Sequence, residues 1–221
     1  MKRWRYVSII SSVVTAGLLL GAGVLVVDQL RVPPEAIASS VTRTPELIER
    51  AWHLPVAATF HRYVNRQSNG SRCGPAAVAN AYRSLGEAAS TEGEVLAGTG
   101  RCWIGVCILG LTLDELAEVA RTNTSRKVTV LRDLSEDQFL EHLRRSNDPG
   151  RRYIVNFDRA QIFGAGVGHH SPIGGYLEAE HLVFVLDVNS DYQPWLVERK
   201  RLFAAVNTFD GDKKRGLLLI E

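Results

Sequence analysis

The sequence has few cysteines, a nearly balanced charge and none of the short motifs that mark common cofactor sites. Its 221 residues include three Cys, which are too few for a disulfide scaffold, and they contain no Gly-rich phosphate loop and no quartet of zinc ligands. Beyond residue 33 the chain has 22 basic and 23 acidic residues, so it lacks the basic field that a nucleic-acid-binding domain needs. With 45% hydrophobic residues, 19 Gly and 8 Pro, the composition is that of one ordinary globular domain.

One long hydrophobic run stands at the amino terminus. Val7–Val27 is uncharged and long enough to cross a hydrocarbon core of about 30 Å as one helix. Lys2, Arg3 and Arg5 precede the run, which predicts that the rest of the chain crosses the membrane. We expect an uncleaved anchor, with a cleaved signal peptide as the second interpretation and a buried soluble helix as the third. The chain after it would then lie on the extracytoplasmic (periplasmic) side of the membrane, or be secreted after cleavage.

The rest of the chain divides into a linker and one folded domain. We expect a membrane anchor or signal segment over residues 1–30 and a linker over residues 31–41, because Pro33 and Pro34 interrupt a helix. One folded domain would occupy residues 42–221, without internal repeats.

Helical patterns come first in this domain and strand patterns come later. The predicted helices follow Cys73, Thr112, Ser135 and Pro194, the last extending to about Thr208. The predicted strands are Lys127–Leu131, Tyr153–Phe157, His181–Val188 and Arg215–Ile220, of which His181–Val188 is apolar enough to be buried on both faces. This order predicts an α+β domain with a mostly antiparallel sheet.

Cys73 is the candidate nucleophile. It follows a loop rich in Gly and Ser and begins a predicted helix, where the positive end of the helix dipole and free N–H groups stabilise a thiolate. Arg72 adds a neighbouring positive charge. A buried, inert cysteine is the alternative interpretation.

His169 and Asp187 are the candidate base and its orienting group. In a hairpin that turns near Glu178, residues 169 and 187 would lie opposite each other, and cross-strand neighbours are close enough for a carboxylate to hold an imidazole. His170 competes with His169, but adjacent strand residues point to opposite faces, so only one should face the cysteine. We expect the remaining histidines to be ordinary polar or surface residues without catalytic roles, namely His53, His61, His142, His170 and His181.

Three further residues have weaker signals. Gln67 precedes Cys73 by six residues and could join its backbone N–H in holding an oxyanion. Cys102 and Cys107 could bind a soft metal ion, close a small disulfide or remain two free thiols, and the disulfide is favoured in an oxidising compartment.

Three blocks of the sequence together resemble a known family. Gln67-x5-Cys73-Gly, the run Gly168-His-His-Ser-Pro-Ile-Gly-Gly-Tyr176 and Leu186-Asp-Val188 are similar to the catalytic domain of the phytochelatin synthases, a papain-like cysteine peptidase group. The resemblance runs from about Arg62 to the end of the chain and does not include the hydrophobic run. It implies a papain-like α+β fold with the catalytic cysteine at a helix start.

The resemblance also implies an activity and roles for residues. Cys73, His169 and Asp187 would form a triad, and Gln67 would be the oxyanion donor. Family members cleave glutathione after its Cys, which releases glycine and leaves a γ-glutamylcysteinyl thioester for transfer to a second glutathione or to water. Gly168 and Arg215 would bind the acyl donor, and a guanidinium can pair bidentately with a free carboxylate. Arg215 in the run Lys213-Lys-Arg could equally be a solvated charge.

The chain departs from the family at two places, and other functions remain open. Ser190 stands where plant members commonly have Arg, and the Cys-rich carboxyl-terminal region of plant enzymes is missing. We therefore expect hydrolysis at least as readily as polymerisation. No cofactor is needed for this chemistry, although cadmium or zinc could enter as thiolates of the substrate. The alternatives are a C39-like peptidase and a non-enzymatic metal-binding thiol module. The expected partners are glutathione or a related γ-glutamyl peptide and the membrane, and not nucleic acid.

Overall fold

The computed structural model describes residues 31–102, 107 and 110–221. The candidate anchor Val7–Val27 lies outside these residues, so its interpretation stays a prediction. Within the part of the chain that the structure describes, no helix has the length and apolar character to span a membrane.

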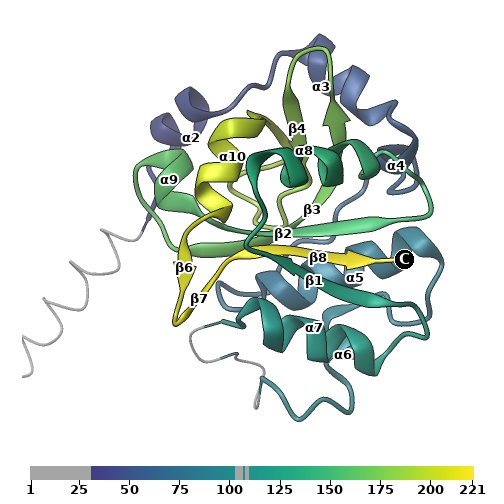
Figure 1. The fold of residues 1–221 in the computed structure, drawn as a ribbon. Helices are drawn as coiled ribbons and strands as arrows, with labels where there is room; N and C mark the ends of the chain where they lie inside the picture. The colour runs from purple at the N-terminus through teal and green to yellow at the C-terminus, as the bar shows by residue number, and fades with distance from the viewer. Residues whose placement is uncertain (1–30, 103–106, 108–109) are drawn as a thin grey trace, which may run out of the picture.

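Six antiparallel strands form the central sheet (Figure 1). In spatial order they are β1 (Val128–Arg132), β8 (Gly216–Ile220), β2 (Arg152–Asp158), β3 (Gly168–Leu177), β4 (Leu182–Val185) and β5 (Trp195–Glu198). A small hairpin of β6 (Phe209–Asp210) and β7 (Lys213–Lys214) stands beside it. The expected mostly antiparallel sheet is confirmed.

Helices cover both faces of this sheet. In chain order they are α2 (Pro34–Ser40), α3 (Pro45–Trp52), α4 (Pro55–Ala58), α5 (Cys73–Leu85), α6 (Glu92–Leu96), α7 (Leu113–Thr122), α8 (Glu136–Arg145), α9 (Arg159–Phe163) and α10 (Arg199–Val206). Capping boxes at Thr112 and Ser135 begin α7 and α8, as their sequences predict.

Two hydrophobic cores result, one on each side of the sheet. Side chains alternate between the two faces along β8, so that Leu218 and Ile220 belong to the core under α5 and α7, whereas Leu217 and Leu219 belong to the core under α8 and α10. Because both faces are covered, every residue of β4 and β8 is buried. Burial on both faces was the expectation for the apolar run that contains β4.

Two expectations about elements are wrong. Residues 194–208 contain strand β5 before helix α10, because Trp195 to Val197 pair with β4 and are buried. The segment 31–41, expected to be a linker, contains α2 and contributes Val32 and Ile37 to the core under α8 and α10. Pro34 opens that helix at a position where the missing N–H has no cost.

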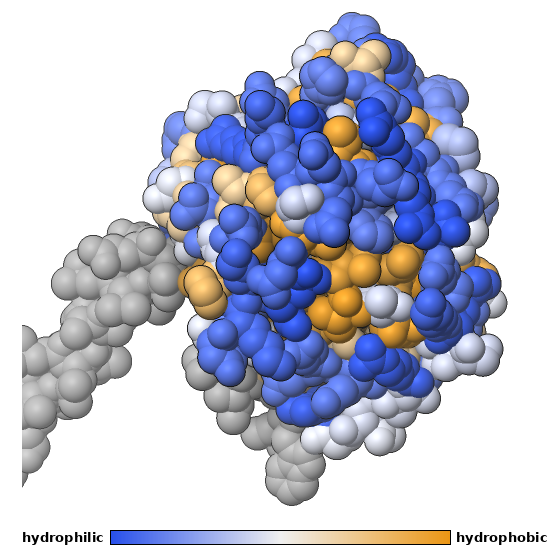
Figure 2. All heavy atoms as spheres, viewed as in Figure 1, coloured by the Kyte–Doolittle hydropathy of each residue, from blue (hydrophilic) through white to orange (hydrophobic). Residues whose placement is uncertain are grey.

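The surface seen in Figure 2 is mainly hydrophilic. Hydrophobic side chains gather in the middle of this face, over the β1 and β8 edge of the sheet (Figure 2). Leu131 of β1 is half-buried and packs against the core under α8 and α10.

Candidate active site

Cys73 is the first residue of α5, as the sequence predicts. The next residue must be small, because a Cβ at Gly74 would lie 2.9 Å from a methyl carbon of Leu116 on α7. The first turn of α5 therefore packs closely against α7. The backbone N–H groups of the first turn have no partner within the helix, so they can stabilise negative charge beside the sulfur.

The loop before Cys73 is held by polar contacts. Glu92 accepts hydrogen bonds from the backbone N–H and the hydroxyl of Ser68, and it pairs with Arg72 at 3.1 Å. This ion pair compensates the positive charge of Arg72. The sequence had suggested that this charge would instead stabilise the Cys73 thiolate. The backbone N–H of Cys107 donates to Ser71 at 3.1 Å, so a second segment also supports the loop.

His169 and Asp187 are in contact. His169 Nε2 lies 2.9 Å from Asp187 Oδ1, and the two residues are 2% and 0% exposed. The predicted contact exists, but the predicted register is wrong. His169 pairs with Phe157 of β2, and Asp187 lies beyond the end of β4.

The register differs because the hairpin turns later in the chain than Glu178, between Leu177 and Leu182, and a bulge at the two adjacent glycines of the SPIGGY block then shifts the pairing by one residue. Leu177 pairs with Leu182, and Ile173 pairs with Val185, with an irregularity between Ile173 and Gly175. Gly175 has a φ of 119°, a conformation that residues with a side chain rarely adopt. A bulge of this kind shifts all later pairings, and the sequence does not show its position.

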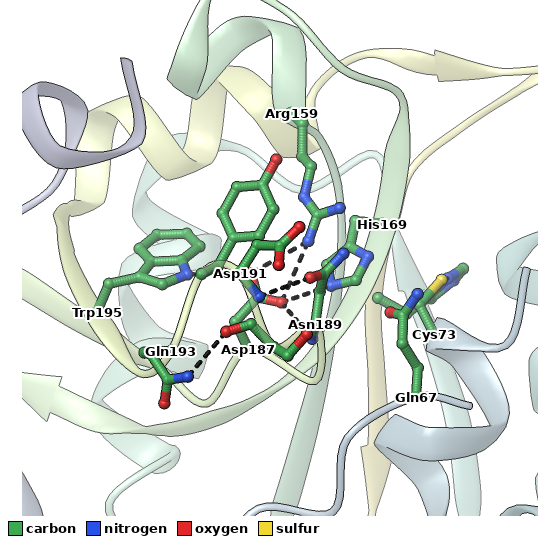
Figure 3. A network of polar contacts seen from close by, with 12 residues as sticks. Gln67, Cys73, Arg159, His169, Asp187, Asn189, Asp191, Gln193 and Trp195 are labelled. Carbon is green, nitrogen blue, oxygen red and sulfur yellow. Dashed lines mark hydrogen bonds and ion pairs between the residues drawn. The ribbon is translucent and has the colours of Figure 1, made fainter. Parts of the chain in front are cut away.

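Asp187 accepts hydrogen bonds from several sides (Figure 3). Besides His169, its donors are Arg159 Nη2 at 3.2 Å, Trp195 Nε1 at 3.0 Å and the backbone N–H of Asn189 at 2.9 Å. The Arg159 guanidinium also stacks on the ring of Tyr192 at 3.9 Å. Arg159 and Trp195 are functional neighbours that the sequence analysis did not assign. A buried carboxylate needs hydrogen-bond or charge partners, so the sequence indicates that Asp187 has such partners. It does not show which residues they are.

These contacts shift the pKa values of the sulfur and the imidazole in directions that favour their charged forms. Burial would raise the pKa of Cys73, but His169 and His170 hold the pKa well below its ordinary value. The pKa of His169 is raised, because Asp187 and Cys73 outweigh burial and the Arg159 charge. The pKa of Asp187 is lowered despite complete burial, chiefly by His169 and Arg159. These directions favour a thiolate on Cys73 beside a protonated His169 that Asp187 orients.

His170 was expected to be an ordinary polar or surface residue, and this is wrong. Only 3% of it is exposed, and its Nδ1 lies 3.9 Å from Cys73 Sγ. Its neighbour His169 packs edge-on against Phe157 on the other face of the sheet. Both imidazoles nevertheless lower the pKa of the Cys73 thiol.

A cavity of about 440 Å³ adjoins the sulfur. Cys73 and His170 line it, together with Gly168, Asp210 and Arg215. Arg215 is 9% exposed, and its Nη1 lies 2.9 Å from Asn156 Oδ1 and 3.3 Å from Asp210 Oδ2. Arg215 is therefore fixed in the cavity wall and is not a solvated surface charge. Gly168 makes room for it, since a Cβ there would overlap the guanidinium.

Gln67 lies beside Cys73 (Figure 3). Its backbone N–H donates to Val188 at 2.8 Å, and its Nε2 donates to the Asn69 carbonyl at 2.9 Å. One hydrogen on Nε2 is left for a further acceptor. The oxyanion role of Gln67 stays a prediction.

Cys102 and Cys107 form a disulfide. This is the first of the three interpretations of the pair, and it leaves neither sulfur free to bind a metal ion. Within the described residues, no group of three or more His, Cys, Asp or Glu side chains could hold a metal. The prediction that Cys102 and Cys107 bind a metal ion is therefore wrong for the disulfide-bonded protein.

Comparison with known proteins gives the family. The family model described as phytochelatin synthase matches residues 27–217. The chain belongs to the phytochelatin synthase family.

Two curated relatives agree with this family. A glutathione gamma-glutamylcysteinyltransferase of Schizosaccharomyces pombe is 29% identical over 117 residues, which are 51% of this chain and 28% of the relative. Glutathione gamma-glutamylcysteinyltransferase 3 of Lotus japonicus is 38% identical over 73 residues, which are 32% of this chain and 15% of the relative. The matched parts are thus well under half the length of these relatives.

Solved structures share the fold at low sequence identity. The peptidase domain of Streptococcus ComA, a bifunctional ABC transporter, is 16% identical with a TM-score of 0.50, covering 72% of this chain and 96% of that chain. A putative C39-like peptidase from Bacillus anthracis is 12% identical with a TM-score of 0.53, covering 73% and 95%. The expected papain-like α+β fold is therefore confirmed.

Proposed function

We propose that this protein cleaves glutathione through a thioester on Cys73 and passes the γ-glutamylcysteinyl group to a second glutathione or to water. The observation that carries the proposal is the Cys73, His169 and Asp187 arrangement, in which Cys73 lines a cavity that Arg215 also lines. The names of the two curated relatives support glutathione as the acyl donor.

The acylation step uses the residues as follows. The Cys73 thiolate attacks the carbonyl carbon of the cysteinyl residue, and the resulting oxyanion is held by the Cys73 backbone N–H and by Gln67 Nε2. His169 gives its proton to the departing nitrogen, so that the carbon–nitrogen bond breaks and neutral glycine amine leaves. Asp187 holds the imidazole ring in orientation throughout.

The second step reverses the proton movement. His169 takes a proton from water or from the amine of a second glutathione, and the new bond to the acyl carbon forms as the sulfur leaves. Arg215 is suited to the α-carboxylate of the glutamyl group, and Asp210 next to it is suited to the ammonium. Cadmium or zinc would enter only as a thiolate of the substrate.

The membrane anchor completes the proposal. Val7–Val27 would tether the domain to a membrane, with the catalytic domain on the extracytoplasmic side. The Cys102–Cys107 disulfide is compatible with an oxidising compartment.

The test is incubation of the full chain with glutathione, followed by glycine analysis and mass spectrometry of the intact protein. We expect free glycine and an adduct with the mass of a γ-glutamylcysteinyl group on Cys73, and neither product with the Cys73→Ser variant. Cleavage of a leader-type peptide without glycine release from glutathione would instead support the C39-like peptidase alternative.

A further inference from the structure

His170 has contacts that the triad does not explain. It is 97% buried, it lines the cavity beside Cys73, and its Nδ1 is 3.9 Å from the sulfur. The opposite ring nitrogen, Nε2, is buried and has no hydrogen-bond partner among the described residues. A buried imidazole with one nitrogen on the nucleophile and the other unpartnered is costly as a structural feature.

His169 and His170 differ in the residues that hydrogen-bond to their ring nitrogens. The Nε2 of His169 is taken by Asp187, which orients that ring as the base. Among the residues that the structure describes, no carboxylate is hydrogen-bonded to His170, and Asn156, its cross-strand neighbour on β2, uses its side chain on Arg215 and Asp210. Since Nε2 of His170 has no acceptor among the described residues, a ring proton there would be buried without a partner, whereas a proton on Nδ1 would face the sulfur.

We propose that His170 is a second catalytic imidazole, which donates its Nδ1–H to Cys73 Sγ from the cavity side. This proposal rests on the proposed function, since it names a further group for the same nucleophile. The hydrogen bond stabilises the thiolate before attack, and it stabilises the same thiolate as leaving group when the thioester breaks. No proton is transferred by His170, so His169 remains the acid and base.

The measurement is the rate of Cys73 alkylation by iodoacetamide across pH, which reports the thiolate without requiring turnover. His170→Leu and His170→Asn form a matched pair, because the two side chains have nearly the same size but only Asn offers an N–H close to the Nδ1 position. We expect the midpoint of the profile to rise by about one pH unit in the Leu variant, the size of one hydrogen bond to a charged group, and to return toward wild type in the Asn variant. Equal midpoints in all three proteins would overturn the proposal.

Other charged groups near the sulfur are the same in both variants, so they cancel in the comparison. They are His169, Asp187, Arg159, Arg72, Glu92, Asp210 and Arg215. Ser171→Ala, which changes the next buried residue of β3, is the control and should leave the midpoint unchanged.

A measurement on the unaltered protein covers the case in which the variants do not fold. Nitrogen NMR of the protein with labelled histidine should show a proton on Nδ1 of His170, and the resonance should shift when Cys73 is alkylated. A ring protonated on Nε2 with a bare Nδ1 would contradict the proposal. This result is independent of glutathione, so failure of the proposed function and failure of the His170 role are distinguishable.

Discussion

Replacement of Asp187 by Asn separates the catalytic role of this carboxylate from its structural role. The side chain is fully buried and contacts His169 at 2.9 Å and Arg159 at 3.2 Å. Asn keeps the shape but removes the charge, so that neither the His169 imidazolium nor the Arg159 guanidinium keeps its counter-ion. One substitution therefore has two effects, which require two measurements.

The expected sizes follow from the two contacts. Loss of the orienting carboxylate in a triad lowers turnover about 10⁴-fold, or about 5 kcal/mol of transition-state stabilisation. A buried cation left without its partner costs about 3–5 kcal/mol of folding stability. Turnover is measured as glycine release from glutathione by the full chain, and stability by denaturant unfolding.

A second substitution distinguishes the two effects. Arg159→Met in the Asp187→Asn background removes the unpaired cation and keeps a long side chain on the Tyr192 ring. We expect most of the lost stability to return while turnover stays low. Turnover within tenfold of wild type in Asp187→Asn, or no recovery of stability in the double variant, would refute the reasoning about this ion pair.

Three further predictions concern the cavity, the disulfide and acid stability. Gly168→Ala places a Cβ against the Arg215 guanidinium, so KM for glutathione should rise at least about tenfold with a smaller change in kcat. Changing both Cys102 and Cys107 to Ser opens a short covalent loop and should lower the free energy of unfolding by about 2 kcal/mol in denaturant titration. Because the pKa of Asp187 is lowered in the folded protein, its ionisation contributes stability above about pH 4 that is lost as the pH falls further, and acid titration should show this loss.

Each of these has its own control. Gly93→Ala adds a Cβ where nothing lies within 4 Å and should leave KM unchanged. Treating the wild type with a reductant should reproduce the lower stability of the two-Ser variant, and an unchanged stability in both would contradict the disulfide estimate. The Asp187→Asn variant should lack the acid-dependent loss, and an equal loss there would assign it to another carboxyl group.

The sequence by itself determined the elements whose signals are local. Cys73 at a helix start follows from the Gly and Pro after it, and the boxes at Thr112 and Ser135 begin their helices because their contacts lie within four residues. The apolar run around β4 indicated burial on both faces, because a strand without alternating polar residues has no side suited to water. The contact between His169 and Asp187 was also predicted, although from a register in which the turn lies too early in the chain.

Only the tertiary structure decided which side chains meet between distant elements. Arg159 follows β2, Trp195 begins β5, and both reach Asp187 because the sheet brings their strand ends together. His170 was assigned to the wrong environment because the expected register put His169 alone on the cysteine side, whereas the structure pairs His170 with Asn156 and turns its Nδ1 toward Cys73. Such placements depend on how the helices and the sheet pack, and no short stretch of sequence contains that information.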